Sequence, residues 1–204
     1  MSRLFTITNA ILVAMAAESL VLGIAAIIAN DTAMFWEYAA RYSARVSFAI
    51  IAGLLLYTAM HGFLTINNSE SKRKILTALI YLFCINHIIH FIHLAANQSV
   101  RNKILIKPGN IPGMIGYGLV LSLPLLLSRG ILSRGKQTML LVSLLLISAF
   151  FIFFYTAHLS GFYASPDPSA AWVYALFASV LALLVLANLR RHISDGRAWR
   201  QSSS

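Results

Sequence analysis

Histidines inside an apolar stretch are the residues of this sequence best suited to chemistry. The segment Asn86-His87-Ile88-Ile89-His90-Phe91-Ile92-His93 contains three histidines at successive spacings of three. On a helix, those steps place the three rings on one face about 120° wide. His158 lies in a later apolar stretch, near its end. A neutral imidazole can bind a metal or a haem iron, so these residues indicate redox or metal chemistry.

A structural role is the alternative for these histidines, because imidazoles hydrogen-bond between helices inside membranes. Glu18 is the only acid within an expected span, on a helix face shared with Ala14 and Ala25. Such a residue is costly in lipid and is a functional candidate. It could pair with a histidine and carry a proton, or it could face a neighbouring helix in its protonated form. A mononuclear zinc or di-iron site is disfavoured, since such sites usually recruit Asp, Glu or Cys as well.

Long apolar stretches must position these side chains. The chain has 204 residues, of which 59% are hydrophobic and 11% charged, and a soluble domain carries about twice that charged fraction. A membrane-spanning helix needs roughly 20 apolar residues. Stretches that meet or nearly meet this length begin and end at about residues 6–28, 46–63, 75–96, 111–127, 139–162 and 171–189. We therefore predict an all-α polytopic membrane protein, a six-transmembrane-helix bundle that forms a single domain over residues 1–204.

The basic residues predict the orientation of this bundle. The net charge of +10 could suggest nucleic acid, but the basic residues lie in short loops between apolar stretches, so we expect no nucleic-acid partner. With the N-terminus in the cytoplasm, 11 of the 16 Lys and Arg residues fall on the inner side. The positive-inside rule thus predicts both termini in the cytoplasm. We expect a multi-pass protein of the cell inner membrane, surrounded by lipid, with the histidines of the third and fifth spans toward the outer side.

Short motifs in a fixed order suggest a family. Tyr42-Ser43-Ala44-Arg45 opens the second span, Arg73-Lys74-Ile75-Leu76 opens the third, and Trp172-Val173-Tyr174-Ala175 begins the sixth. Over about residues 40–191, their order and spacing resemble the ferric-reductase-like transmembrane domain. The resemblance is closest to its small bacterial branch, the haem-binding membrane subunit of the periplasmic methionine-sulfoxide reductase system.

This resemblance implies a haem b held between the third and fifth spans. Carried over by position, His87 and His158 would be the axial ligands of the iron. Depth in the membrane favours His90 over His87 on the third span, so His90 is the reserve ligand. Arg45 would lie near the outer rim, where its cation could meet a haem propionate.

The same resemblance implies one haem and a redox function. Leu145 and Arg73 stand where two-haem members have histidines, so a second haem is not expected. The chain has no Gly-x-Gly-x-x-Gly loop, which indicates a redox subunit rather than a complete enzyme. A quinol in the bilayer or a separate flavoprotein would donate electrons, and a protein at the outer face would accept them. A quinone is therefore a second candidate cofactor. The alternatives are a non-redox transporter or accessory membrane subunit and, with less support, a histidine-rich hydroxylase or desaturase.

Overall fold

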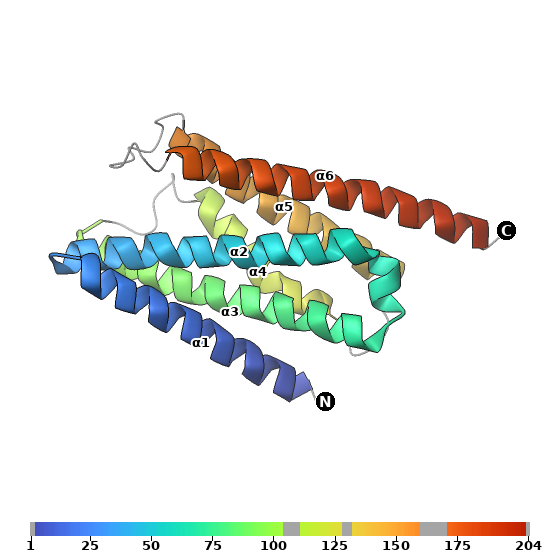
Figure 1. Cartoon of the computed structure of the whole chain (residues 1–204), viewed down its shortest axis with the longest axis horizontal. Helices are drawn as coiled ribbons and strands as arrows, with labels where there is room; N and C mark the ends of the chain where they lie inside the picture. The colour runs from blue at the N-terminus through green and yellow to red at the C-terminus, as the bar shows by residue number, and fades with distance from the viewer. Residues whose placement is uncertain (1–2, 104–110, 128–131, 160–170, 203–204) are drawn as a thin grey trace. The chain divides into compact units, whose positions relative to one another are not determined.

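The computed structural model describes residues 3–103, 111–127, 132–159 and 171–202. These ranges contain no strand and form six helices (Figure 1): α1 (Arg3–Ile28), α2 (Thr32–Asn67), α3 (Glu70–Val100), α4 (Ile111–Leu126), α5 (Arg134–Leu159) and α6 (Ala171–Ser202). The prediction of an all-helical chain with six helices is therefore confirmed.

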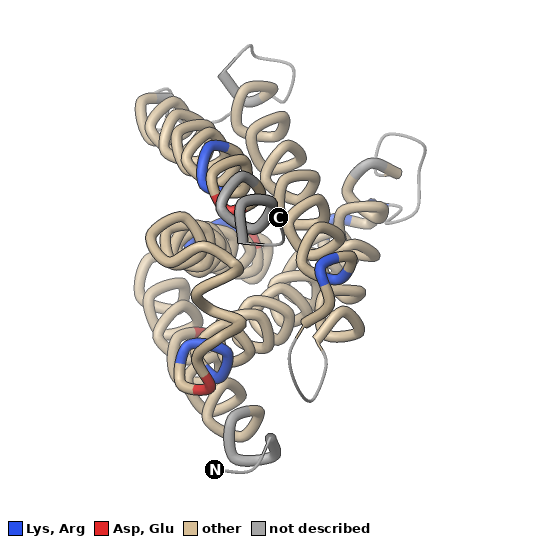
Figure 2. The backbone as a smooth tube through the Cα atoms, turned by 90° about the vertical axis from the view of Figure 1, so that its right-hand side faces the viewer, with Lys and Arg blue, Asp and Glu red and all other residues tan. Residues whose placement is uncertain are grey.

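Most of the helices can cross a membrane. Five of them, α1, α2, α3, α5 and α6, contain stretches long and apolar enough to do so. The remaining helix, α4, is apolar but has 16 residues, which span about 24 Å of a hydrocarbon core about 30 Å thick. Figure 2 shows how few positions along the chain carry a charge. Large apolar side chains such as Ile27 (84% exposed) and Leu125 (80%) face outward, as expected where lipid is the solvent. The chain is a multi-pass membrane protein.

Several helices begin before or end after the predicted spans. The second helix begins at Thr32 rather than near Val46, and the last continues to Ser202 rather than ending near Leu189. Arg41 and several other basic residues therefore lie in helices, and their predicted placement in short loops is wrong. The reason is physical: hydropathy marks only the part of a helix that suits hydrocarbon, whereas backbone hydrogen bonding continues into polar residues with good helix propensity. The loop between the fifth and sixth predicted spans, residues 163–170, lies outside the described ranges.

The chain divides into two compact units. The first unit comprises Met1–Ile50 and Thr77–Leu125, and the second comprises Ile51–Leu76 and Leu126–Ser204. The first unit thus contains α1, the first part of α2, most of α3 and α4 up to residue 125. The second contains the rest of α2, the start of α3, α5 and α6.

A break in α2 is the main irregularity of the second unit. Gly62 has φ 69° and ψ 151°, a conformation open essentially to glycine alone, and α2 changes direction near its end (Figure 1). Side chains of α6 bind the backbone groups on either side of the break. Arg191 Nη2 donates to the carbonyl of His61 at 3.1 Å, and Asp195 Oδ2 accepts from the backbone N–H of Leu64 at 3.5 Å. Side chains of α6 therefore help to hold the break.

Two buried asparagines connect elements of the second unit. Asn188 of α6 donates through Nδ2 to the carbonyl of Leu55 at 2.8 Å, and its Oδ1 accepts from Thr58 Oγ1 at 2.7 Å. Asn67, at the end of α2, donates to the carbonyl of Leu132 at 3.0 Å. The Asn67 side-chain oxygen accepts from the backbone N–H of Leu132 at 2.7 Å. Each of these two side-chain amides both donates and accepts a hydrogen bond. Each therefore fixes the position of its own helix relative to the segment that it contacts.

Candidate functional site

The site begins with a buried stripe along α1. The stripe consists of small or apolar residues that are each at most 5% exposed, namely Ala10, Ala14, Val21 and Ala25. Glu18 lies on the same stripe and is 3% exposed. Small side chains allow other helices to approach closely. Glu18 consequently points into the first unit rather than toward lipid, and its predicted place on the face of Ala14 and Ala25 is confirmed.

A chain of hydrogen bonds runs from Glu18 across three helices. Glu18 Oε1 accepts from Ser43 Oγ of α2 at 2.7 Å and from Asn86 Nδ2 of α3. Asn86 Oδ1 in turn accepts from Ser47 Oγ at 2.7 Å. The two serines and the asparagine are fully buried. Glu18 Oε1 accepts hydrogen bonds, so the NH₂ group of the Asn86 amide must face it and the Asn86 oxygen must face Ser47. Glu18 therefore sets the orientation of the Asn86 side chain.

This chain determines the tautomer of His87. Ser47 has one hydroxyl proton, and it donates that proton to Asn86. Ser47 Oγ also lies 3.2 Å from His87 Nδ1, so at this contact the oxygen must accept and Nδ1 must carry the hydrogen. In a neutral imidazole the lone pair is then on Nε2.

Aromatic rings surround His87 and the neighbouring histidine. The His87 ring lies 4.6 Å from Tyr117 of α4, 5.4 Å from Phe83 and 5.5 Å from His90, measured between ring centroids. His90 stacks near Tyr117, with the centroids 6.4 Å apart and 21° between the planes. The backbone of Ala40 lies within hydrogen-bonding reach of His90. Two of the three histidines therefore share one apolar environment built from α3 and α4.

His93 has different neighbours. Its Nδ1 lies 3.5 Å from Glu18 Oε2, and its ring centroid is 5.9 Å from that of Trp36. The backbone of Ala39 lies within hydrogen-bonding reach of the ring. The histidine stripe of α3 thus has two parts, an aromatic part around His87 and a carboxyl-linked part at His93.

The remaining predicted site residues are only partly tested. The backbone of His158 lies in the last turn of α5, in the second unit, but its side chain is outside the described residues. Its pairing with His87 as a haem ligand therefore stays a prediction. Arg45 is half-buried and its guanidinium lies 4.9 Å from the centre of the Tyr42 ring. Within the described ranges, no three His, Cys, Asp or Glu side chains come close enough together to hold a metal ion.

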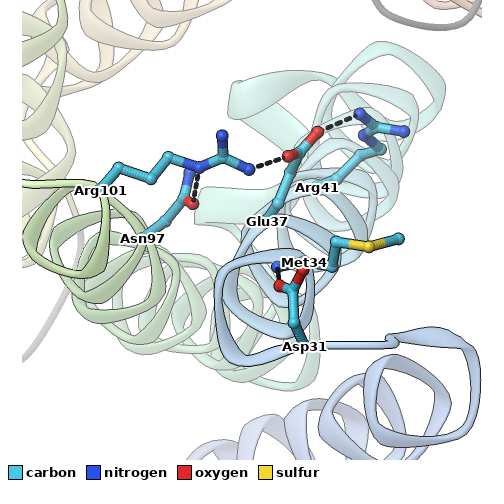
Figure 3. A network of polar contacts seen from close by, with 6 residues as sticks. All are labelled: Asp31, Met34, Glu37, Arg41, Asn97 and Arg101. Carbon is cyan, nitrogen blue, oxygen red and sulfur yellow. Dashed lines mark hydrogen bonds and ion pairs between the residues drawn. The ribbon is translucent and has the colours of Figure 1, made fainter.

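An ionic cluster joins the start of α2 to the end of α3 (Figure 3). Glu37 accepts from Arg41 Nη2 at 2.8 Å and from Arg101 of α3. Arg101 Nε also donates to Asn97 Oδ1 at 3.0 Å. Asp31 Oδ1 accepts from a backbone N–H in the first turn of α2 at 2.7 Å, as a helix cap does. Arg41 and Arg101, which the predicted orientation places on the outer side, thus share one carboxylate, and the cluster keeps one net positive charge.

Sequence reasoning missed the polar residues that orient the site. Ser43, Ser47 and Asn86 were not singled out, although each carries a hydrogen bond of the Glu18 chain. A signal existed for the serines, because residues four apart share a helix face and both lie beside an apolar stretch. Asn86 directly precedes His87, so it was visible but had no assigned partner.

Comparison with protein-family models, curated proteins and solved structures found no match for this chain. The resemblance to the ferric-reductase-like domain therefore stays a prediction, and function has to be inferred from the chemistry of the site.

Proposed function

We propose that this chain is a haem b-binding membrane protein that passes electrons from a quinol or a flavoprotein to an acceptor at the outer face. The observation that carries the proposal is the bond between His87 Nδ1 and Ser47 Oγ. Metal-ligating histidines almost always engage their second ring nitrogen in this way, which orients the ring and raises its basicity. His87 of α3 therefore has the hydrogen bonding expected of an axial haem ligand.

The protein's own groups would hold His87 in place. Ser47 fixes the ring, Asn86 fixes Ser47, and Glu18 fixes Asn86. Phe83 and Tyr117 cover the ring and exclude water from it. Bound haem b would supply one-electron chemistry at a potential that burial and the axial ligands tune.

The other assignments belong to the same proposal. His158 would be the second axial ligand, with His90 as the reserve ligand on α3 and Arg45 as a cation for a haem propionate. Leu145 and Arg73 limit the protein to one haem. The chain would lie in the cell inner membrane with both termini in the cytoplasm, supported by the excess of basic residues on that side. It would act as a redox subunit, with a separate electron donor and a separate outer-face acceptor.

A reduced-minus-oxidised absorption spectrum of the detergent-purified protein, from cells supplied with haem, tests this proposal. The wild type should show a sharp α-band, and both His87→Ala and His158→Ala should lose it. His192→Ala, a histidine of α6 outside the site, is the matched control and should keep the band. If His158→Ala alone removes the band, His90 is the ligand on α3. A folded wild-type protein without any haem band would refute the proposal.

A non-redox transporter or accessory subunit is the second candidate. It is favoured by the contact between His93 and Glu18 and by the hydrogen bonds that already engage the buried polar groups of α1, α2 and α3. In that case the histidines would carry protons or join helices, and the purified protein would be colourless. The absorption spectrum therefore separates the two candidates directly.

A further inference from the structure

The two oxygens of Glu18 have unequal surroundings. Oε1 accepts hydrogen bonds from Ser43 and Asn86. Oε2 is buried and has no hydrogen-bond partner among the described residues, and the same is true of His93 Nδ1. These two atoms lie 3.5 Å apart, in side chains that are 4% and 5% exposed. A carboxyl group with two donors on one oxygen and none on the other is arranged like a carboxylic acid, with its carbonyl at Oε1 and its hydroxyl at Oε2.

We propose that Glu18 and His93 form a proton-binding site inside the first unit, in which one proton is shared between Glu18 Oε2 and His93 Nδ1. With the proton on Oε2, both side chains are neutral. Transfer breaks the O–H bond and forms an N–H bond, which leaves a carboxylate beside an imidazolium. The total charge is the same in both states. The pair does not include the proposed haem ligand His87, although Glu18 also orients Asn86 in the chain that leads to it. Its own ligand is the proton.

Burial explains why the pair would hold one proton. Removing it altogether would leave an uncompensated carboxylate in a low-dielectric interior, which is costly. Adding a second proton would leave an uncompensated imidazolium, which is costly for the same reason. Ser43 and Asn86 lower the cost of the carboxylate state, since both donate to Oε1. The neutral and ion-pair states are therefore both accessible.

The groups around the pair come from α2 and α3. Helix α2 presents the Ser43 hydroxyl to Glu18, and the Trp36 ring and the Ala39 backbone to His93. Helix α3 adds Asn86 and, one turn before His93, the imidazole of His90.

Formal charges on these elements include the cluster of Glu37, Arg41 and Arg101, at the start of α2 and the end of α3, and Arg45 of α2, whose guanidinium lies over the Tyr42 ring. Within the described structure none of these four residues forms an ion pair with Glu18 or His93. The titratable neighbour that interacts with His93 on α3 is the imidazole of His90.

Infrared spectroscopy of the full-length protein in lipid vesicles tests this inference. The wild type should show the carbonyl stretch of a carboxylic acid, shifted in D₂O and lost only at high pH, because losing the band with pH requires the pair to release its proton. Labelling with ¹³C-glutamate should shift this band, which assigns it to a glutamic acid without any substitution. Glu18→Gln should remove the band, while Glu37→Gln, which changes a partly exposed acid of the ionic cluster, should leave it unchanged.

His93→Leu distinguishes a proton-sharing pair from a glutamic acid that is merely packed. Without the imidazole, the carboxylate would lose its cationic partner, so the band should persist to higher pH than in the wild type. Circular dichroism of each variant confirms that the helices are intact. A wild-type band absent at every pH, or one that responds neither to pH nor to His93→Leu, would overturn the inference. Because the band does not depend on bound haem, neither result bears on the haem proposal.

Discussion

Gly62→Ala should destabilise the protein strongly, for two reasons that the structure supplies. At φ 69° and ψ 151°, a residue with a Cβ is strained by about 1–3 kcal/mol. The added Cβ would also lie 2.5 Å from both Arg191 Nε and Asp195 Oδ2, so these side chains must move away. That movement breaks the bond from Arg191 to the His61 carbonyl, and a hydrogen bond to a charged group contributes about 1.5–3 kcal/mol.

Together the backbone strain and the broken hydrogen bond would cost about 2.5–6 kcal/mol. The expected loss lies toward the low end of this range. The Arg191 side chain is 40% exposed, and water therefore replaces part of what the broken bond contributed. We expect a loss of about 3–4 kcal/mol, which corresponds to a fall in unfolding temperature of roughly 10 °C for a chain of this size. Thermal unfolding in detergent, followed by circular dichroism, measures the change.

Gly53→Ala is the matched control on the same helix. Its added Cβ has nothing within 4 Å and its φ is not positive, so the substitution should be neutral or should stabilise the helix by about 0.5–1 kcal/mol. Asp195→Ala should give an intermediate loss, because it removes one of the two side chains at the break. Equal unfolding temperatures for Gly62→Ala and Gly53→Ala would show that the break in α2 is not held as described.

Three further substitutions test other contacts. Asn188→Leu should cost about 1–2 kcal/mol in unfolding free energy, because the average hydrogen bond between membrane helices contributes about 0.6 kcal/mol and this amide makes two such bonds and one within α6. Thr58→Val removes one of these bonds and should cost less in the same thermal unfolding experiment. Glu37→Gln should change stability by less than about 1 kcal/mol, since the pair is partly exposed, and high salt should reduce the difference from wild type. Ser47→Ala should lower haem retention by roughly 10–100-fold while helicity is unchanged, because it removes the partner of His87 Nδ1; equal haem content in the variant and wild type would contradict that role.

The sequence predicts the helices of this protein better than their ends. Apolar stretches identify the membrane-embedded parts because transfer into hydrocarbon is costly for charged residues. The first turns of α2 before Val46 and the last turns of α6 after Leu189 escape this signal, since their helical hydrogen bonds do not require apolar side chains. Gly62 shows a further limit: its break depends on Arg191 and Asp195, which reach it from another helix.

The candidate site, too, is only partly predictable from the sequence. Glu18 and His87 stand out in the sequence because ionisable groups are rare inside membranes. Ser43, Ser47 and Asn86 do not, since small polar side chains in helices often bond only to their own backbone. Their partners depend on how α1, α2 and α3 are rotated about their axes, which one sequence does not specify. The unequal hydrogen bonding of the two Glu18 oxygens is therefore visible only in the structure.

The haem content of the purified protein tests the central proposal most directly. The protein would be produced in haem-supplied cells, purified in detergent, and assayed for haem by conversion to its pyridine complex, with the chain quantified by amino-acid analysis. We predict one haem b per chain, held in part by His87. A folded protein with no haem would contradict the proposal, and two haems per chain would contradict the limit inferred from Leu145 and Arg73.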